Sequence, residues 1–395
     1  MRYCLPLLLL MLCAPISAQQ SMFAELDQYL KQEVDKRQMA GSVALIIKDG
    51  KEELHESYGY SNLEEESMMK KDHIFHIMSM TKPIVTVAFM MLYEEGHFEL
   101  DDPVAKYLPE FSDLRVSLDP NKGADGPTEA AASPVTIAQV MSHTAGFSHG
   151  LGGTTLDNEI ARNLYYSPQK DIADRVKTLA SLPLVYQPGT RWYYSASPDI
   201  LARLIEVFSE QTVEEFLQER IFTPLSMNDT GYNLSEEQAK RFVALHRFDD
   251  KGKLMRDVTQ MPPSGHTVFG GTHGLLSTAS DYAKFCRMLL NKGSLNGQQF
   301  LKPETLDLMT SNQLGDIPYQ KGMGFGYGFG LRTTDPEDGT DSAGRYYWSG
   351  AYCTFFFVDP QNDLIAILMT QSNPYSGKYG DQLRKHVYRA LGSRK

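Results

Sequence analysis

Ser79 and Lys82 are the residues whose types and spacing point most directly to chemistry. Residues at i and i+3 share one face of a helix, so a helix that begins at Ser79 places the Lys82 amine beside the Ser79 hydroxyl. A neutral amine there accepts the hydroxyl proton and makes the oxygen nucleophilic. Burial or the positive end of the helix dipole must first bring the pKa of the amine far below its usual range. The pair predicts a serine nucleophile that is activated without histidine.

The residues after Lys82 have the pattern of an amphipathic helix that holds this pair in place. Pro83 fits a first turn, and Gly96 is placed to end the helix. The apolar residues at helical spacing are Ile84, Val87, Ala88, Met91 and Leu92. A Ser-x-x-Lys pattern alone is weak, because chance produces it in many chains and a solvated helix start is the better explanation of it. The assignment therefore depends on partners further along the chain.

Composition and the first residues restrict the class of protein. With 395 residues, 42% of them hydrophobic and 22% charged, the chain is expected to form one or two globular domains. A net charge of −11 without a basic patch is unfavourable for nucleic-acid binding. Residues 1–18 combine Arg2, an apolar run at 5–12 and small residues up to Ala18, which is the layout of a secretory signal peptide. We expect export to the periplasm or the extracellular space, and no stable membrane span, because the apolar run is too short.

Cysteine and histidine usage indicates neither a disulfide framework nor a metal site. Cys286 and Cys353 remain after cleavage of the leader, and they either pair with each other or stay free. The ten histidines are scattered, and no metal-binding motif occurs among them. We expect no metal and no cofactor, and the sequence leaves the oligomeric state open.

The order of expected elements predicts an α/β (α+β) fold, with an antiparallel sheet flanked by helices and an inserted, mainly helical region. Expected helices cover residues 22–37, 137–141, 172–179, 200–208, 213–221 and 380–391. Expected hairpins join strands 42–48 and 52–60 through Asp49-Gly50, and strands 355–358 and 364–369 through residues 359–362. Residues 119–134 are expected to form an exposed loop. We therefore expect residues 19–78 and 265–395 to form the sheet domain, and residues 79–264 to form the helical region that carries the nucleophile and tyrosine motifs.

Four further motifs follow Ser79 in order, and together they carry a family resemblance. They are His143-Thr144-Ala145-Gly146, the Pro188-Gly189-Thr190 turn that leads to Tyr194-Ser195, Gly270-Gly271-x-x-Gly274-Leu275, and Trp348-Ser349-Gly350-Ala351. Tyr194 alone is best explained as a core aromatic residue. Taken together with Ser79 and Lys82, these ordered motifs resemble those of the serine β-lactamase and penicillin-binding-protein superfamily. The resemblance is closest to the class C β-lactamase-related branch that includes serine esterases.

The resemblance implies a site and a reaction. Ser79 would attack an acyl carbon, Lys82 and Tyr194 would share the role of base, and Tyr194 would return a proton to the leaving group. A nearby ammonium is expected to lower the pKa of the phenol. The backbone N–H groups of Ser79 and Ala351 would form the oxyanion hole. Trp348, Ser349 and Gly350 would contact the substrate, a small-molecule ester or amide.

Two departures from the family pattern bear on the substrate. Ala196 stands where β-lactamases usually have an amide-binding Asn, and Trp348 stands where they have the Lys that attracts the lactam carboxylate. A carboxylesterase is therefore the expected function. The alternatives are a β-lactamase or a D-Ala-D-Ala-type peptidase, or a non-catalytic acylation sensor, although such a sensor commonly lacks the serine, the lysine or the tyrosine.

Three other patterns have simpler explanations than catalysis. Ser148 lies in a Gly-x-Ser-x-Gly sequence, but the strand-turn-helix context of a nucleophile elbow is not predicted around it. The alternating glycines at 322–330 do not have dinucleotide-binding spacing, and they favour a strand that passes close to another backbone. His266 and His273 are expected at the surface rather than on a metal.

Overall fold

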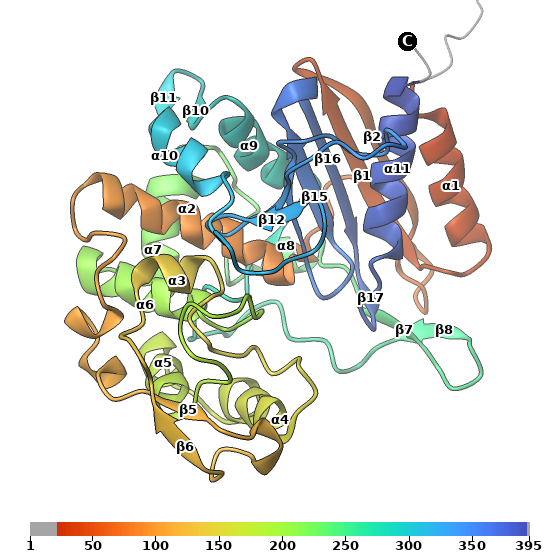
Figure 1. The fold of residues 1–395 in the computed structure, drawn as a ribbon. Coiled ribbons are helices and arrows are strands. Elements are labelled where there is room, and N and C mark those ends of the chain that lie inside the picture. Colours follow the sequence, from red (N-terminus) through yellow and green to blue (C-terminus); the bar gives the residue numbers. More distant parts are fainter. Residues whose placement is uncertain (1–21, 393–395) are drawn as a thin grey trace, which may run out of the picture.

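The structure is a computed structural model that describes residues 22–392, and it contains an eight-stranded sheet beside a mainly helical region (Figure 1). The signal peptide predicted at residues 1–18 lies outside the described residues. All neighbouring strands of the sheet run antiparallel. The sheet and the helices on both of its faces confirm the α/β fold that was predicted with an antiparallel sheet.

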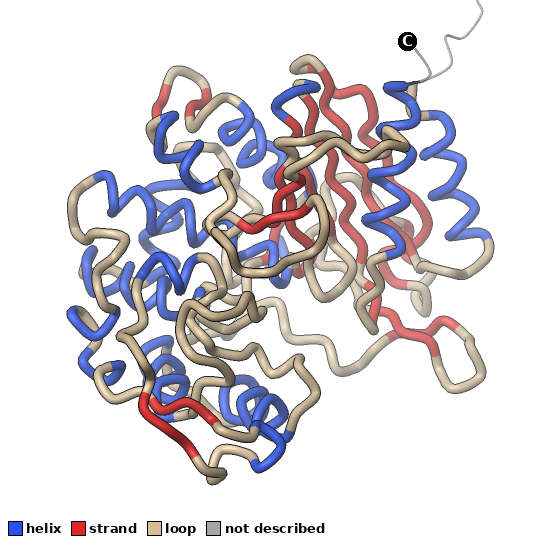
Figure 2. Tube along the Cα trace, in the orientation of Figure 1, coloured by secondary structure: helices blue, strands red, loops and turns tan. Residues whose placement is uncertain are grey.

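The two ends of the chain build the centre of the sheet (Figure 1), whose strands lie side by side in Figure 2. The central strands β1 and β16 pair from Ser42 opposite Thr370 to Lys48 opposite Leu364. In spatial order the strands are β12 (Met323–Phe325), β13 (Gly330–Arg332), β14 (Tyr346–Ser349), β15 (Phe355–Asp359), β16 (Leu364–Thr370), β1 (Gly41–Lys48), β2 (Lys51–Asn62) and β3 (Ser67–Met68).

The strand sequences explain the layers on either face of the sheet. Both predicted hairpins are present, and the first turns at Asp49 and Gly50, whose φ angles are 51° and 74°, as a two-residue hairpin turn requires. Successive side chains of a strand point to opposite faces. Accordingly, Leu45 belongs to the hydrophobic core on one face of β1, and Ile46 belongs to the core on the other face.

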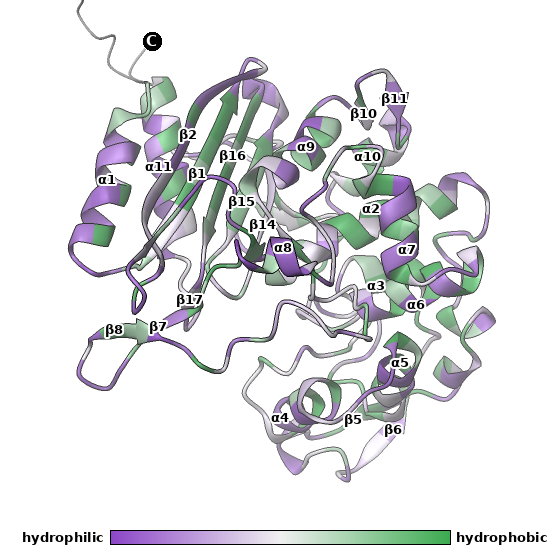
Figure 3. Ribbon diagram, turned by 180° about the vertical axis from the view of Figure 1, so that it is seen from behind, coloured by the Kyte–Doolittle hydropathy of each residue, from purple (hydrophilic) through white to green (hydrophobic). Residues whose placement is uncertain are grey.

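Helices from both ends of the chain cover one face of the sheet, and α9 (Ala279–Leu290) packs against the other (Figure 1). The first face carries α1 (Ala24–Asp35) and α11 (Lys378–Gly392), as predicted for 22–37 and 380–391. Figure 3 shows the apolar residues of the sheet between these layers. The core on the α9 side continues without interruption into α2 (Thr81–Glu94), which is almost entirely buried.

The mainly helical region lies beside the sheet and includes the helices expected there. Besides α2, its helices are α3 (Ile137–Met141), α4 (Thr155–Ala161), α5 (Ile172–Ser181), α6 (Pro198–Ser209), α7 (Val213–Leu217) and α8 (Glu236–Ala239), with π-helical turns at Arg162–Tyr166 and Gln218–Phe222, while α10 (Pro303–Met309) follows α9. The predicted helix over 213–221 is thus a short α-helix that a π turn extends. The division of the chain at residues 79 and 265 stays a prediction.

A short strand pair outside the main sheet corrects the expectation that residues 119–134 form only a loop. The segment 119–134 is not all loop, because β6 (Thr128–Ala130) pairs with β5 (Arg115–Ser117). The Arg115 side chain also bonds the Thr128 carbonyl at 3.2 Å. The remaining short strands are β4 (Phe75–His76), β7 (His246–Phe248), β8 (Leu254–Arg256), β9 (Leu276–Ser277), β10 (Ser294–Leu295), β11 (Gln298–Gln299) and β17 (Ser372–Asn373). Within residues 22–392, no helix is both long and apolar enough to cross a membrane.

Candidate active site

Ser79 lies in a tight turn between β4 and α2, where the backbone is held on several sides. The turn is a 3₁₀ helix, Met78–Met80, and Met78 has a φ angle of 48°, a strained value for a residue that is not glycine. The Ile77 N–H donates to the Leu275 carbonyl at 3.1 Å, and the Tyr282 hydroxyl donates to the Met80 carbonyl at 3.0 Å. These bonds fix the position of the Ser79 hydroxyl at the start of α2.

Lys82 lies one turn after Ser79, as predicted from the i, i+3 spacing. Its Nζ is 3.2 Å from Ser79 Oγ and donates to the Thr272 carbonyl at 2.8 Å. The residue is only 1% exposed. Burial lowers the pKa of Lys82 to about 7, and the negative charge of Asp199 acts in the opposite direction. A large fraction of the amine is therefore unprotonated near neutral pH.

Tyr194 reaches the same oxygen from the loop before α6. Its hydroxyl donates to Ser79 Oγ at 2.7 Å, and Lys82 Nζ lies 4.6 Å from the centre of its ring. The expectation that Lys82 lowers the pKa of this phenol is wrong. Burial raises the pKa of Tyr194 well above its usual range, although the polar groups of Ser79 and Trp348 act in the opposite direction. The phenol therefore keeps its proton at the pH where Lys82 loses its own.

The Trp348-Ser349-Gly350-Ala351 motif lies at the end of β14, against the backbone that precedes Ser79. A Cβ on Gly350 would lie 2.4 Å from the Ile77 carbonyl oxygen, so only glycine allows this approach. Thr354 Oγ1 also donates to the Ile77 carbonyl, at 3.3 Å. Ala351 is exposed in the turn that follows. This packing places the third motif beside Ser79, while the oxyanion hole of the Ser79 and Ala351 N–H groups stays a prediction.

Aromatic side chains form one wall of the site. Trp348 lies 5.6 Å from Tyr194 and 5.3 Å from Phe325, measured between ring centres. Trp192 continues this wall, 5.5 Å from Phe325 and 5.0 Å from Tyr319. Ser349 adds a hydroxyl, which lies 3.2 Å from the Tyr375 hydroxyl. Trp348 thus contributes an apolar surface where a lysine would contribute a charge, and Ala196, which is fully buried, contributes no amide.

Several residues around Lys82 and Tyr194 were missed in the sequence. The His149 ring stacks on Tyr194 with 5.1 Å between ring centres and 10° between planes. The Thr272 N–H donates at 2.8 Å to Asp199 Oδ1, and Asp199 lies in the first turn of α6. The Gly270-Gly271 pair was the sequence signal for this contact. Glycine is needed there because the backbone passes close to the start of α6: a Cβ at Gly271 would lie 2.0 Å from the Pro198 carbonyl oxygen.

The structure explains the patterns that were set aside as non-catalytic. Ser148 is fully buried and donates to Asp157, and His143 bonds Ser195 Oγ at 2.8 Å instead of Ser148. The Gly-x-Ser-x-Gly sequence is therefore not a nucleophile elbow. A Cβ at Gly326 would lie 2.0 Å from the Met309 carbonyl, which confirms a close backbone approach in the glycine-rich segment.

The expectation that both His266 and His273 lie at the surface is only partly correct. Both residues are partly exposed, but His273 Nδ1 is buried without a hydrogen-bond partner, and its ring lies 5.1 Å from Tyr165. Among residues 22–392 there is no group of His, Cys, Asp or Glu side chains that could hold a metal ion. Cys286 and Cys353, the two cysteines in the described part of the chain, are both free.

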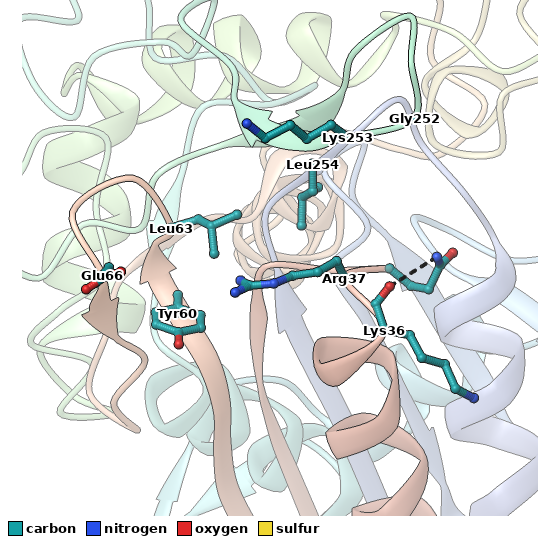
Figure 4. A pocket seen from close by; sticks show the side chains of 9 residues that line it. Lys36, Arg37, Tyr60, Leu63, Glu66, Gly252, Lys253 and Leu254 are labelled. Carbon is teal, nitrogen blue, oxygen red and sulfur yellow. Dashed lines mark hydrogen bonds between the residues drawn. The ribbon is translucent and has the colours of Figure 1, made fainter.

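A surface pocket with a volume of about 380 Å³ lies elsewhere, between the end of α1, β2 and β8 (Figure 4). It is lined by Lys36, Arg37, Tyr60 and Glu66, among others, and by none of the predicted site residues. Its charged side chains are exposed and of both signs. The predicted site at Ser79 therefore lies outside this pocket.

A serine hydroxyl between a phenol and an amine with a pKa near neutrality, on this fold, defines a serine hydrolase. The chain belongs to the beta-lactamase family, which it matches over residues 26–389.

Three similar proteins cover nearly the whole chain. Protein Rv1367c of Mycobacterium tuberculosis (strain ATCC 25618 / H37Rv) is 31% identical over 362 residues, which cover 87% of this chain and 89% of that protein. Esterase EstB of Burkholderia gladioli is 29% identical over 395 residues, which cover 93% and 95%. The structure of EstCE1, a hydrolase with promiscuous acyltransferase activity, shares the fold with a TM-score of 0.78 at 23% identity, over 94% of this chain and 100% of that one.

Proposed function

We propose that this enzyme is a carboxylesterase that works through an acyl-enzyme on Ser79. The observation that carries the proposal is the convergence of two groups on one oxygen. Lys82 Nζ lies 3.2 Å from Ser79 Oγ, and the Tyr194 hydroxyl lies 2.7 Å from it. Both distances allow direct proton transfer.

The different pKa values of the two groups assign their roles. Neutral Lys82 takes the Ser79 proton while Oγ attacks the ester carbonyl, because the phenol of Tyr194 is still protonated. When the tetrahedral intermediate collapses, the C–O bond to the alcohol breaks, and Tyr194 gives its proton to the departing oxygen. The Lys82 ammonium then returns a proton to Tyr194. Water, activated by the same groups, releases the acid in the second half of the reaction.

The wall beside Ser79 favours esters over β-lactams. Trp348, which packs against the buried Phe325, offers an apolar surface to the acyl or alcohol part of a substrate. A lactam carboxylate would find no lysine at position 348 and no amide at the buried position 196. The similarity to Esterase EstB supports the same preference.

The experiment that tests the nucleophile is labelling with a fluorophosphonate probe. Purified wild-type protein should be labelled on the peptide that contains Ser79, and Ser79→Ala should abolish the labelling. Ser148→Ala is the matched control, because Ser148 is buried and bonded to Asp157. Labelling that is lost with Ser148 and retained without Ser79 would contradict the assignment.

Substrate preference is tested by parallel assays on short-chain aryl esters, a chromogenic cephalosporin and a D-Ala-D-Ala peptide. We expect the ester to have the highest kcat/KM. Trp348→Lys should lower ester turnover by about tenfold or more, since it replaces an apolar contact with a charge, while Trp348→Phe should retain most of it. Faster hydrolysis of the cephalosporin or the peptide than of every ester would place the enzyme in the β-lactamase or peptidase branch. Acylation without turnover on all three would indicate a sensor.

We also propose that the protein is exported, on the basis of the leader pattern in residues 1–18. N-terminal sequencing of the protein from the extracytoplasmic fraction should then begin at Gln19. Recovery of the uncleaved chain from the cytoplasm alone would contradict this proposal.

A further inference from the structure

A buried carboxylate, Asp199, lies behind the proposed base and is connected to it through one residue, Thr272. Asp199 Oδ1 accepts the Thr272 N–H at 2.8 Å, and the Thr272 carbonyl accepts a hydrogen bond from Lys82 Nζ at 2.8 Å. Thr272 Oγ1 also donates to the Ala196 carbonyl at 3.1 Å. Thr272, whose carbonyl orients Lys82, is thus held by Asp199 of α6 and by Ala196 in the loop before it.

The charge of Asp199 is only partly compensated. Arg175 Nη1 lies 3.7 Å from Asp199 Oδ2, a distance that allows an ion pair but no hydrogen bond. Asp199 Oδ2 and Arg175 Nε and Nη1 are all buried without hydrogen-bond partners. The fully buried carboxylate lies in the first turn of α6, near the positive end of the helix dipole.

The other titratable groups near Lys82 contribute no negative charge. They are Tyr194, whose phenol keeps its proton, and the imidazoles of His143, His149 and His273, whose pKa values burial lowers far below neutrality. Asp199 is therefore the carboxylate that acts on the Lys82 amine from within this cluster.

We propose that Asp199 is a positioning residue for Lys82, which holds the Thr272 carbonyl against the amine and supplies the negative charge that keeps the amine a strong base. This inference rests on the proposed function, because it assigns Lys82 the role of base. Without that charge a buried amine loses its proton more readily and is a weaker base, which slows proton transfer from Ser79.

The experiment compares the pH dependence of kcat/KM for an aryl ester and of the rate of fluorophosphonate labelling. Asp199→Asn keeps an oxygen that can accept the Thr272 N–H but removes the charge. Its acid limb should move to lower pH, by on the order of one pH unit, and its plateau should fall. Asp199→Ala also removes the anchor, so kcat should fall further, by roughly tenfold or more. KM should change little, because Asp199 is fully buried.

Arg175→Gln is the second variant, and it acts in the opposite direction. It removes the positive charge beside Asp199 and so moves the acid limb to higher pH. Asp281→Asn is the matched control, because Asp281 is also buried, accepts a backbone N–H at 2.7 Å and pairs with Lys284. This control should leave the acid limb in place.

Opposite displacements in the two variants, with none in Asp281→Asn, would support the inference. Folded variants whose acid limb stays at the wild-type pH, or a control that moves it equally, would overturn it. The proposed function would still stand in that case, because it fails only if wild-type protein does not turn over esters or if Ser79→Ala is still labelled.

Discussion

At the scale of single residues, the site is defined by burial, which shifts the pKa values of two groups that contact one oxygen in opposite directions. Burial lowers the pKa of Lys82, so its ammonium gives up a proton easily. Burial raises the pKa of Tyr194, so its phenol keeps its proton. Burial thus acts on both groups in the sense that favours their neutral forms. A neutral amine is a base and a neutral phenol is an acid, so the same physical cause supplies both partners for Ser79.

The pH dependence of ester hydrolysis follows from these directions. Since the proposed mechanism requires an unprotonated Lys82, kcat/KM should rise with pH through a midpoint of about 7 and then level off, with no fall caused by Tyr194 until strongly alkaline pH. Lys82→Met and Tyr194→Phe should each lower kcat by a factor on the order of a hundred or more. Circular dichroism should show both variants folded. A Tyr194→Phe enzyme with normal turnover would remove the tyrosine from the mechanism.

At the scale of elements, the site depends on three segments that meet at one short stretch of backbone. The turn before α2 carries Ser79, the loop before α6 carries Tyr194, and the end of β14 carries Gly350. Ile77 connects the turn before α2 to the end of β14. Its N–H donates to the Leu275 carbonyl, and its own carbonyl accepts from Thr354 and packs against Gly350. Small displacements of this contact move the third motif relative to the nucleophile.

Gly350→Ala tests this contact. The added Cβ would approach Thr354 Oγ1 and the Ile77 carbonyl to 2.2 and 2.4 Å, so β14 must move away from Ser79. We expect ester kcat/KM to fall on the order of a hundredfold, the cost of a misplacement of about 1 Å. Gly231→Ala is the control, because its Cβ would find no atom closer than 3.8 Å. Equal activity of both variants would show that the third motif is not positioned by this glycine.

At the scale of the whole molecule, one hydrophobic core joins the sheet to the helical region. Val43 and Ile367 of the sheet belong to the same cluster as Ile84 of α2 and Ile200 of α6. The chain has two tryptophans, Trp192 and Trp348, and both lie in the wall beside Ser79. Tryptophan fluorescence therefore reports on the site, and far-UV circular dichroism reports on the whole fold.

Because the core is continuous, we expect the fluorescence and circular dichroism transitions to coincide during urea unfolding. Ile367→Ala, which removes a fully buried side chain from β16, should shift both transitions together and lower the free energy of unfolding by about 2–5 kcal/mol. A fluorescence transition at clearly lower urea concentration would show instead that the site unfolds separately from the sheet.

The sequence by itself determined the features that depend on local pattern. Helical spacing placed Lys82 beside Ser79, Asp49-Gly50 and alternating side chains indicated the hairpins, and Trp348 in place of lysine pointed toward esters. These predictions do not depend on tertiary contacts, because they follow from the geometry of one helix, one turn or one residue type.

Only the tertiary structure decided the features that depend on burial and on distant partners. The pKa of Tyr194 rises where a decrease was expected, because desolvation outweighs the polar groups of Ser79 and Trp348, and desolvation cannot be read from spacing. Likewise, Asp199 and Thr272 lie 73 residues apart and meet through a hydrogen bond that no local pattern encodes. The sequence identified the nucleophile and its two partners as candidates, whereas the surroundings that set their proton affinities arise from packing across the whole chain.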